Sequence, residues 1–177
     1  MKKSLMTVSY ILMLIFLYSH PLDGQAGPPE EGIESENGVF KGMVVRVIDG
    51  DSMVIRVNRE NRIIALYGID CPENSQAYGN AARYWVTMLV FHEEVRVKPI
   101  PPDNYRETPA LIYFGDDRCL NQELVMAGLA WVEERSCQQP ECIRWLEGEN
   151  KARNTGVGLW KEKAPTPPWK WREMQSR

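Results

Sequence analysis

The segment Arg46–Glu73 constrains the fold most, because it places an acidic cluster after each of two hydrophobic, strand-like segments. Asp49-Gly50-Asp51 follows the first strand-like segment, and Asp70-Cys71-Pro72-Glu73 follows the second. Between them, Ser52–Asn58 and Arg62–Ile69 alternate in the way that is typical of two strands joined by a polar turn. Carboxylates at strand ends are the oxygen ligands that hard cations such as Ca²⁺ prefer. The segment therefore predicts a hairpin with a candidate cation site at its ends.

The first 26 residues have the pattern of a secretory signal peptide. Lys2 and Lys3 precede the apolar run Leu5–Tyr18, which is too short for a comfortable membrane span. Gly24-Gln25-Ala26 then supplies the small residues of a cleavage site. An uncleaved N-terminal anchor is the alternative, and the short apolar run argues against it. We therefore expect a secreted or periplasmic protein that has no stable membrane span after cleavage.

Five strands and three helices are predicted after the signal peptide, and most of them show clear periodicity. The expected strands are Val39–Ile48, Ser52–Asn58, Arg62–Ile69, Val95–Ile100 and Ala110–Phe114. The expected helices are Ser75–Glu93, Leu120–Val132 and Cys142–Arg153. This order, with one helix inserted after the third strand, fits an α+β, β-rich fold in which helices cap a five-stranded OB-type barrel.

Composition divides the chain into four parts. Residues 1–26 are the signal peptide, and residues 27–38 are rich in Pro, Gly and Glu, which predicts a flexible acidic linker. Residues 39–163 hold the OB-type domain, and residues 164–177 form a tail rich in Pro and Trp, with no helical or strand pattern. We expect Trp169 and Trp171 to pack over the barrel or a helix; stacking on nucleic-acid bases is the alternative.

The four cysteines suggest one local disulfide. Cys137 and Cys142 enclose a short loop that contains a proline, and in an exported protein a bridge between them would pin the connection between two helices. Two free thiols are the alternative. Cys71 and Cys119 could also pair with each other, and the sequence does not decide between a bridge and two free thiols.

The formal net charge of −3 gives no support to non-specific nucleic-acid binding. Such binding depends mainly on the neutralisation of phosphates by basic residues, so non-specific binders are usually positively charged. A local basic patch is nevertheless compatible with this net charge.

Seven short motifs resemble those of the staphylococcal-nuclease-like, or thermonuclease, family in its exported bacterial form. They span most of residues 39–172: Val47–Ser52, Leu66–Glu73, Gln76–Gly79, Asp103–Tyr105, Asn121–Val125, Gly128–Trp131 and Gly158–Trp160. The resemblance implies the OB-barrel fold. It also implies calcium-dependent hydrolysis of phosphodiester bonds in DNA or RNA.

The same resemblance implies a set of site residues. The calcium ligands of the family correspond to Asp51, Asp70 and the backbone carbonyl of Cys71. Glu73 corresponds to a glutamate that contacts the metal shell and positions the attacking water, which makes it a candidate general base. Oxygen ligands suit Ca²⁺, and the ion would offset negative charge on the phosphate. Asp49 is expected to support its turn rather than to bind metal.

Both phosphate-clamping arginines of the family are replaced. One family arginine lies five residues before the second aspartate, where this chain has Ala65, and the other corresponds to Glu107. The loss of one preorganised charge donor typically slows a reaction about 10²–10³-fold, and the Glu107 carboxylate would repel a phosphate. Arg106 is a candidate substitute, but on an extended backbone its side chain would point to the opposite face.

We therefore expect an exported nuclease-type phosphodiesterase with impaired hydrolysis, whose candidate partner is single-stranded DNA or RNA. The alternative is a non-catalytic member of the fold that acts as a ligand-binding or protein-interaction module, because a fold alone does not determine function. A basic side chain that reached the carboxylates from Arg56, Arg62 or Arg106 would favour the enzyme.

Overall fold

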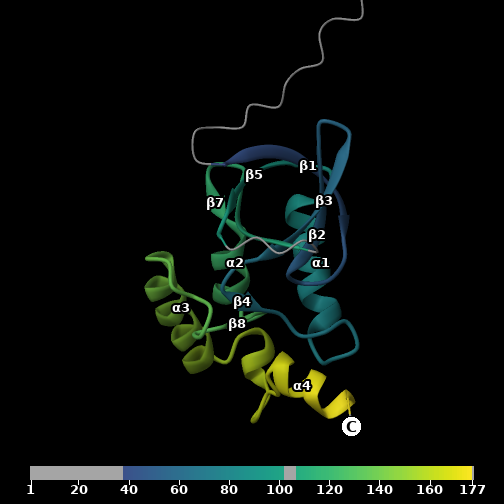
Figure 1. Cartoon of the computed structure of the whole chain (residues 1–177). Coiled ribbons are helices and arrows are strands. Elements are labelled where there is room, and N and C mark those ends of the chain that lie inside the picture. Colours follow the sequence, from purple (N-terminus) through teal and green to yellow (C-terminus); the bar gives the residue numbers. More distant parts are fainter. Residues whose placement is uncertain (1–37, 102–106, 177) are drawn as a thin grey trace, which may run out of the picture.

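The computed structural model describes residues 38–101 and 107–176 (Figure 1). The predicted signal peptide, the linker up to residue 37 and the candidate substitute Arg106 lie outside the described residues. Within the described ranges, none of the helices has the length and apolar character that crossing a membrane requires.

A closed barrel of five strands forms the centre of the fold. Its strands are β1 (Phe40–Val47), β2 (Ser52–Val57), β3 (Glu60–Leu66), β5 (Glu94–Pro99) and β6 (Thr108–Phe114). Neighbouring strands run antiparallel in the order β3-β2-β1-β5-β6, and a parallel pairing between β3 and β6 closes the barrel. This topology confirms the predicted OB-type α+β fold.

Alternating residues of the strands fill the barrel. In β1, Phe40 and Val44 are buried and their neighbours Lys41 and Met43 are exposed. The register then shifts between Val44 and Arg46, so the next buried residue is Val47 rather than Arg46. Such a bulge bends and twists a strand, which helps a short sheet to close on itself.

Helices and short strands pack around the barrel, and most of them lie beside or below its centre in Figure 1. The helices are α1 (Gly79–Val90), α2 (Leu120–Met126), α3 (Glu141–Thr155) and the 3₁₀ helix η1 (Gly158–Lys161). The short strands are β4 (Ile69–Asp70), β7 (Arg118–Cys119) and β8 (Trp131–Val132). Strands β4 and β8 pair with each other and lie between the barrel and the C-terminal helices (Figure 1).

Helix α2 is shorter than the predicted Leu120–Val132. It ends at Met126, and Gly128 adopts a φ of +66°, a conformation that glycine accepts without strain. The backbone N–H of Leu129 donates to the carbonyl of Leu124, which satisfies one of the free carbonyls at the helix end. The chain can therefore leave the helix and enter β8.

The expectation that the tail has no helix is wrong. Helix α4 (Pro168–Gln175) forms the C-terminal end of the described chain, and proline stands at its first position, where its fixed φ suits a helix and its missing N–H costs nothing. The prolines at positions 165, 167 and 168 hide this helix in a search for hydrophobic periodicity. It is the one helix that the sequence analysis did not predict among the four α-helices of the described residues.

The structure confirms the disulfide between Cys137 and Cys142, whose Cα atoms lie 5.7 Å apart. It pins the loop between β8 and the start of α3. Cys71 and Cys119 are free thiols, so the pairing that the sequence left open does not occur. Burial raises the pKa of both thiols, and most strongly that of Cys71.

Candidate functional site

The two acidic clusters meet because Gly50 has no side chain. A Cβ atom at Gly50 would lie 2.7 Å from the Cβ of Cys71 and 2.8 Å from the Cβ of Ala82, closer than real Cβ contacts allow. Gly50 is not among the residues with positive φ, so this turn uses glycine for the space that it leaves rather than for an unusual backbone conformation. The close contact brings Asp51 against the segment that carries Asp70.

Asp49 and Asp51 have different roles in this turn. Asp49 Oδ1 accepts hydrogen bonds from the backbone N–H groups of Asp51 at 3.0 Å and Ser52 at 2.7 Å, which confirms its predicted role in the turn. Asp51 Oδ2 accepts a hydrogen bond from the backbone N–H of Cys71. Burial raises the pKa of Asp51 well above its usual range, and the neighbouring Asp49 and Asp70 raise it further. A cation nearby would favour the ionised form of this carboxylate.

Asp70 and Glu73 are held by backbone pairing on either side of Pro72. Asp70 pairs with Trp131 in the β4–β8 ladder and is 9% exposed. The backbone N–H of Glu73 donates to Gln76 Oε1 at 3.2 Å, and its carbonyl accepts from the Gln76 N–H at 2.8 Å. A Cβ at Gly79 would lie 1.8 Å from the Glu73 carbonyl oxygen, so only glycine lets α1 begin against this loop.

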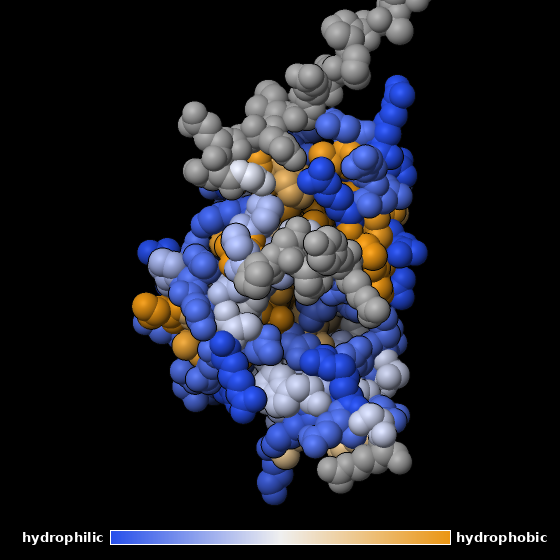
Figure 2. All heavy atoms as spheres, viewed as in Figure 1, coloured by the Kyte–Doolittle hydropathy of each residue, from blue (hydrophilic) through white to orange (hydrophobic). Residues whose placement is uncertain are grey.

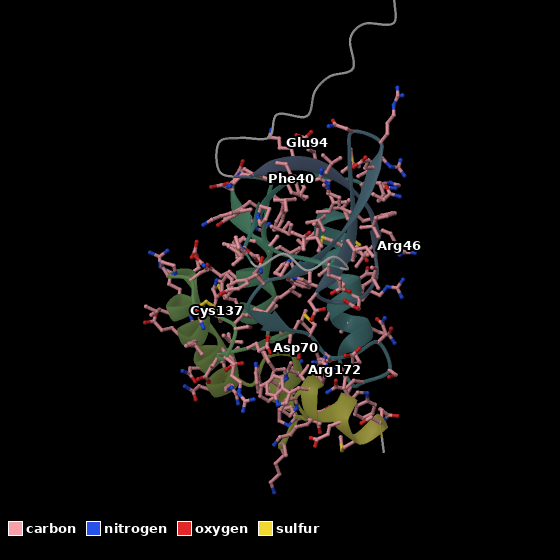
Figure 3. The ribbon with its side chains drawn as sticks, in the orientation of Figure 1. Phe40, Arg46, Asp70, Glu94, Cys137 and Arg172 are labelled. Carbon is pink, nitrogen blue, oxygen red and sulfur yellow. A yellow bond between two sulfur atoms is a disulfide. The ribbon has the colours of Figure 1, made fainter. Side chains whose placement is uncertain are left out.

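One guanidinium group joins the two carboxylates. Arg172 Nη1 donates to Asp70 Oδ1 at 3.1 Å and to Glu73 Oε1 at 2.8 Å, and Nη2 donates to Asp70 Oδ2 at 2.8 Å. Figure 3 shows Asp70 and Arg172 side by side where β4 approaches α4. Burial raises the pKa of Asp70, and the hydrogen bonds and charge of Arg172 partly offset that rise. The hydrogen bonds that Arg172 donates to Asp70 and Glu73 raise its pKa.

Helix α4 places Arg172 at the site because one of its two tryptophans, Trp169, docks on β8. The rings of Trp169 and Trp131 meet edge to face with centroids 5.7 Å apart. Since Trp131 is the ladder partner of Asp70, and residues three apart lie on one face of a helix, this docking directs Arg172 toward Asp70. Gln76 Nε2 also donates to the carbonyl of Thr166 at 2.6 Å, just before the helix.

A cleft of about 590 Å³ is lined by both the acidic and the basic residues of the site. Among the residues that line it are two expected metal ligands, the two positions that the family resemblance assigns to arginines and the arginine of α4: Asp51, Asp70, Ala65, Glu107 and Arg172. Ala65 lies on the outer face of β3, since its neighbours Ile64 and Leu66 are buried in the barrel. The two replaced positions therefore line the same cleft as the carboxylates.

The carboxylates suit a hard cation in their chemistry, but a guanidinium holds two of them. Asp70 and Glu73 both place an oxygen 2.8 Å from an Arg172 nitrogen, so they already converge on one positive charge. Across the described ranges, no three His, Cys, Asp or Glu side chains are arranged as a metal-binding group. A divalent cation that used the oxygens of Asp70 and Glu73 would have to displace Arg172.

The structure separates the predicted site residues into three groups. Asp70 and Glu73 both accept hydrogen bonds from Arg172. Asp51 is linked to the same segment because it accepts a hydrogen bond from the backbone N–H of Cys71, the residue after Asp70. Arg106 lies outside the described residues. Two other arginines that could have reached the carboxylates make contacts on the barrel surface and do not line the cleft: Arg56 donates to Asn61, and Arg62 lies over the ring of Phe40.

Arg172 is the site residue that the sequence analysis missed. The sequence holds only a weak signal for it. Pro168 can start a helix, and Trp169 and Arg172 would then lie on one face of that helix. Only the partner of Trp169, which is 38 positions earlier in the chain at Trp131, determines where that face docks.

Comparisons with known proteins show the family to which the chain belongs. The model of the family described as staphylococcal nuclease homologue matches residues 63–162. Micrococcal nuclease of Shigella flexneri is 36% identical over 141 residues, which cover 75% of this chain and 80% of that protein. A protein described as an uncharacterized endonuclease of Escherichia coli O157:H7 is 37% identical over 166 residues, which cover 94% of this chain and 98% of that protein. The chain belongs to the staphylococcal nuclease homologue family.

Proposed function

We propose that this chain is an exported nuclease-type phosphodiesterase with impaired calcium-dependent hydrolysis of single-stranded DNA or RNA. One observation carries the proposal: a single cleft is lined by the acidic residues Asp51 and Asp70 and by Ala65 and Glu107, where the family has arginines. The names of the relatives, micrococcal nuclease and endonuclease, support a nucleic acid as the substrate.

Asp51, Asp70 and the carbonyl of Cys71 would hold the calcium ion. Bound calcium supplies positive charge that favours attack on a phosphodiester. The raised pKa of the buried Asp51 supports this assignment, since a desolvated carboxylate among other carboxylates gains most from a cation. Glu73 is the candidate general base, and it would accept the proton of the attacking water through a carboxylate oxygen.

The impairment follows from two side chains. Ala65 offers no hydrogen-bond donor to a phosphate in the cleft, and Glu107 adds a negative charge to its wall. Each missing charge donor lowers the rate by about 10²–10³, although two such losses need not add. We therefore expect slow hydrolysis rather than the rate of a family member that keeps both arginines.

Export is the third part of the proposal. The N-terminal 26 residues have the signal-peptide pattern described above. The Cys137–Cys142 disulfide supports a non-cytoplasmic location, because such bonds persist mainly in oxidising compartments.

A cleavage assay tests the proposed activity. Purified protein without residues 1–26 is incubated with single-stranded DNA in calcium or in a chelator, beside Glu73→Gln and the control Glu147→Gln, an exposed residue on α3. We expect slow cleavage that needs calcium, falls about 10²-fold or more in Glu73→Gln and is unchanged in Glu147→Gln. Cleavage that persists in the chelator or in Glu73→Gln contradicts the mechanism. Intact DNA after long incubation would support a non-catalytic binding module instead.

A further inference from the structure

The guanidinium of Arg172 has two edges, and the carboxylates use only one. The edge formed by Nη1 and Nη2 makes all three hydrogen bonds to Asp70 and Glu73. An arginine carries five N–H donors, so the Nε–H and one Nη2–H remain on the other edge. Within residues 38–101 and 107–176, no hydrogen bond is recorded for that second edge.

The second edge is accessible from the cleft. The Arg172 side chain is 51% exposed, whereas that of Asp70 is 12% exposed. Arg172 lines the cleft together with Ala65 and Glu107, the two positions at which the family arginines are missing. The half-exposed guanidinium of Arg172 therefore lines the same cleft as those two positions.

The helix that carries Arg172 is fixed to the rest of the fold at several points. Pro168 is buried, the ring of Trp169 contacts that of Trp131 in β8, and the carbonyl of Thr166 accepts a hydrogen bond from Gln76. Asp70 and Glu73 hold the guanidinium itself. This preorganisation matters, because a fixed donor fork loses little conformational freedom when it binds a ligand.

We propose that Arg172 is the phosphate-binding arginine of this cleft, supplied by the C-terminal helix α4, and that it offers its Nε–Nη2 edge to a phosphodiester group of a single-stranded nucleic acid. Two parallel N–H donors match two phosphate oxygens, which is the geometry of the strongest arginine–phosphate contacts. The carboxylates on the opposite edge orient the fork.

The surrounding surface agrees with a polar ligand. On the face shown in Figure 2, the region of α4 is hydrophilic, and hydrophobic residues show mainly over the barrel and on the outer side of α3. The inference rests on the proposed function for the nature of the ligand, a phosphodiester. It does not need calcium, because the contact is between Arg172 and the phosphate.

A binding experiment separates this role from general electrostatic attraction. The probe is a short single-stranded DNA with phosphorothioate linkages, which resist hydrolysis, and its affinity is measured by fluorescence anisotropy in calcium and in EDTA at several salt concentrations. The variants are Arg172→Gln, Arg172→Lys and the matched control Lys170→Gln, which removes one exposed positive charge from the same helix.

We expect Arg172→Gln to weaken binding about tenfold or more in EDTA, and by a smaller factor in calcium, where the ion competes with Arg172 for Asp70 and Glu73. In EDTA it should also lower the slope of log affinity against log salt by about 0.7. Arg172→Lys should recover only part of the affinity, since lysine lacks the fork. Lys170→Gln should change affinity less than about twofold. Equal effects of Arg172→Gln and Lys170→Gln would overturn the proposal. Far-ultraviolet circular dichroism checks that each variant is folded, and if Arg172→Gln unfolds, the shortfall of Arg172→Lys relative to wild type decides the question.

Calcium titration by calorimetry then distinguishes this inference from the proposed function. Arg172→Gln should bind calcium more tightly than the wild type, because the ion no longer competes with a guanidinium for Asp70 and Glu73. Calcium binding that is absent from the wild type and from Arg172→Gln would contradict the proposed metal site. The DNA affinities in EDTA would still decide whether Arg172 binds phosphate.

Discussion

At the scale of single residues, the site depends on two aspartates whose ionised forms are disfavoured by burial. Asp51 is a carboxylate whose pKa is raised mainly by burial and further by Asp49 and Asp70. Asp70 experiences the same desolvation, but Arg172 donates to both of its oxygens. Asp51 therefore differs from Asp70: its recorded donor is a backbone N–H, that of Cys71, rather than a cation.

Asp51→Asn should raise the free energy of unfolding near neutral pH in the absence of calcium. Because the folded-state pKa of Asp51 is raised, its ionised form destabilises the fold; this cost is fully present above the folded-state pKa and disappears as the pH falls to the ordinary value of 3.8. Urea unfolding from about pH 7 to about pH 4 measures the difference between variant and wild type, which should shrink toward acid pH.

The control for this experiment is Asp116→Asn, an exposed residue beyond the end of β6. Its stability should follow that of the wild type across the same range. A decrease in stability of Asp51→Asn at neutral pH would show that the Asp51 carboxylate is compensated in the folded protein, contrary to its raised pKa.

At the scale of elements, α4 is the part of the site that local sequence patterns do not reveal. The strands of the barrel follow from alternation, and α1 follows from helical periodicity, although it begins at Gly79 rather than at Ser75. Helix α4 has no such apolar stripe, and Pro168 is its one buried residue. Its position depends on a ring contact with Trp131, which is distant in sequence.

Trp169→Ala should loosen α4 and leave the barrel folded. An edge-to-face aromatic pair contributes about 0.5–1.5 kcal/mol beyond the area that it buries, so the amide hydrogens of α4 should exchange about tenfold faster. Hydrogen exchange followed by mass spectrometry measures this, with Met174→Ala, an exposed residue of the same helix, as the control. Unchanged exchange in α4 would show that the contact with Trp131 does not hold the helix.

At the scale of the whole molecule, the site lies where three distant segments meet at the lower end of the barrel (Figures 1 and 3). The β1–β2 turn supplies Asp51, the segment that begins with β4 supplies Asp70 and Glu73, and α4 supplies Arg172. The chain crosses from the first segment to the last over more than a hundred residues. Loss of the tail would therefore remove part of the site without removing the core of the barrel.

The sequence predicted the parts of this arrangement that local patterns or family motifs encode. The five-stranded barrel and the Cys137–Cys142 disulfide are confirmed, whereas the order of the strands in the sheet and the parallel pairing that closes it come from the structure. The contact between Arg172 and Asp70 could not be predicted, because it depends on the docking of α4, which no local pattern specifies. The role of Gly50 could not be predicted either, because the need for space there arises only once Ala82 and Cys71 are in place.

The decisive measurement is the rate of single-stranded DNA cleavage by the double variant Ala65→Arg plus Glu107→Arg, compared with wild type in saturating calcium. We propose that the cleft keeps the carboxylates needed for hydrolysis and lacks two phosphate-binding arginines, one at Ala65 in β3 and one at Glu107 just before β6. We therefore expect the double variant to cleave about 10²-fold faster or more, and this gain to disappear when Glu73→Gln is added. A double variant that folds and cleaves no faster than the wild type would contradict the claim.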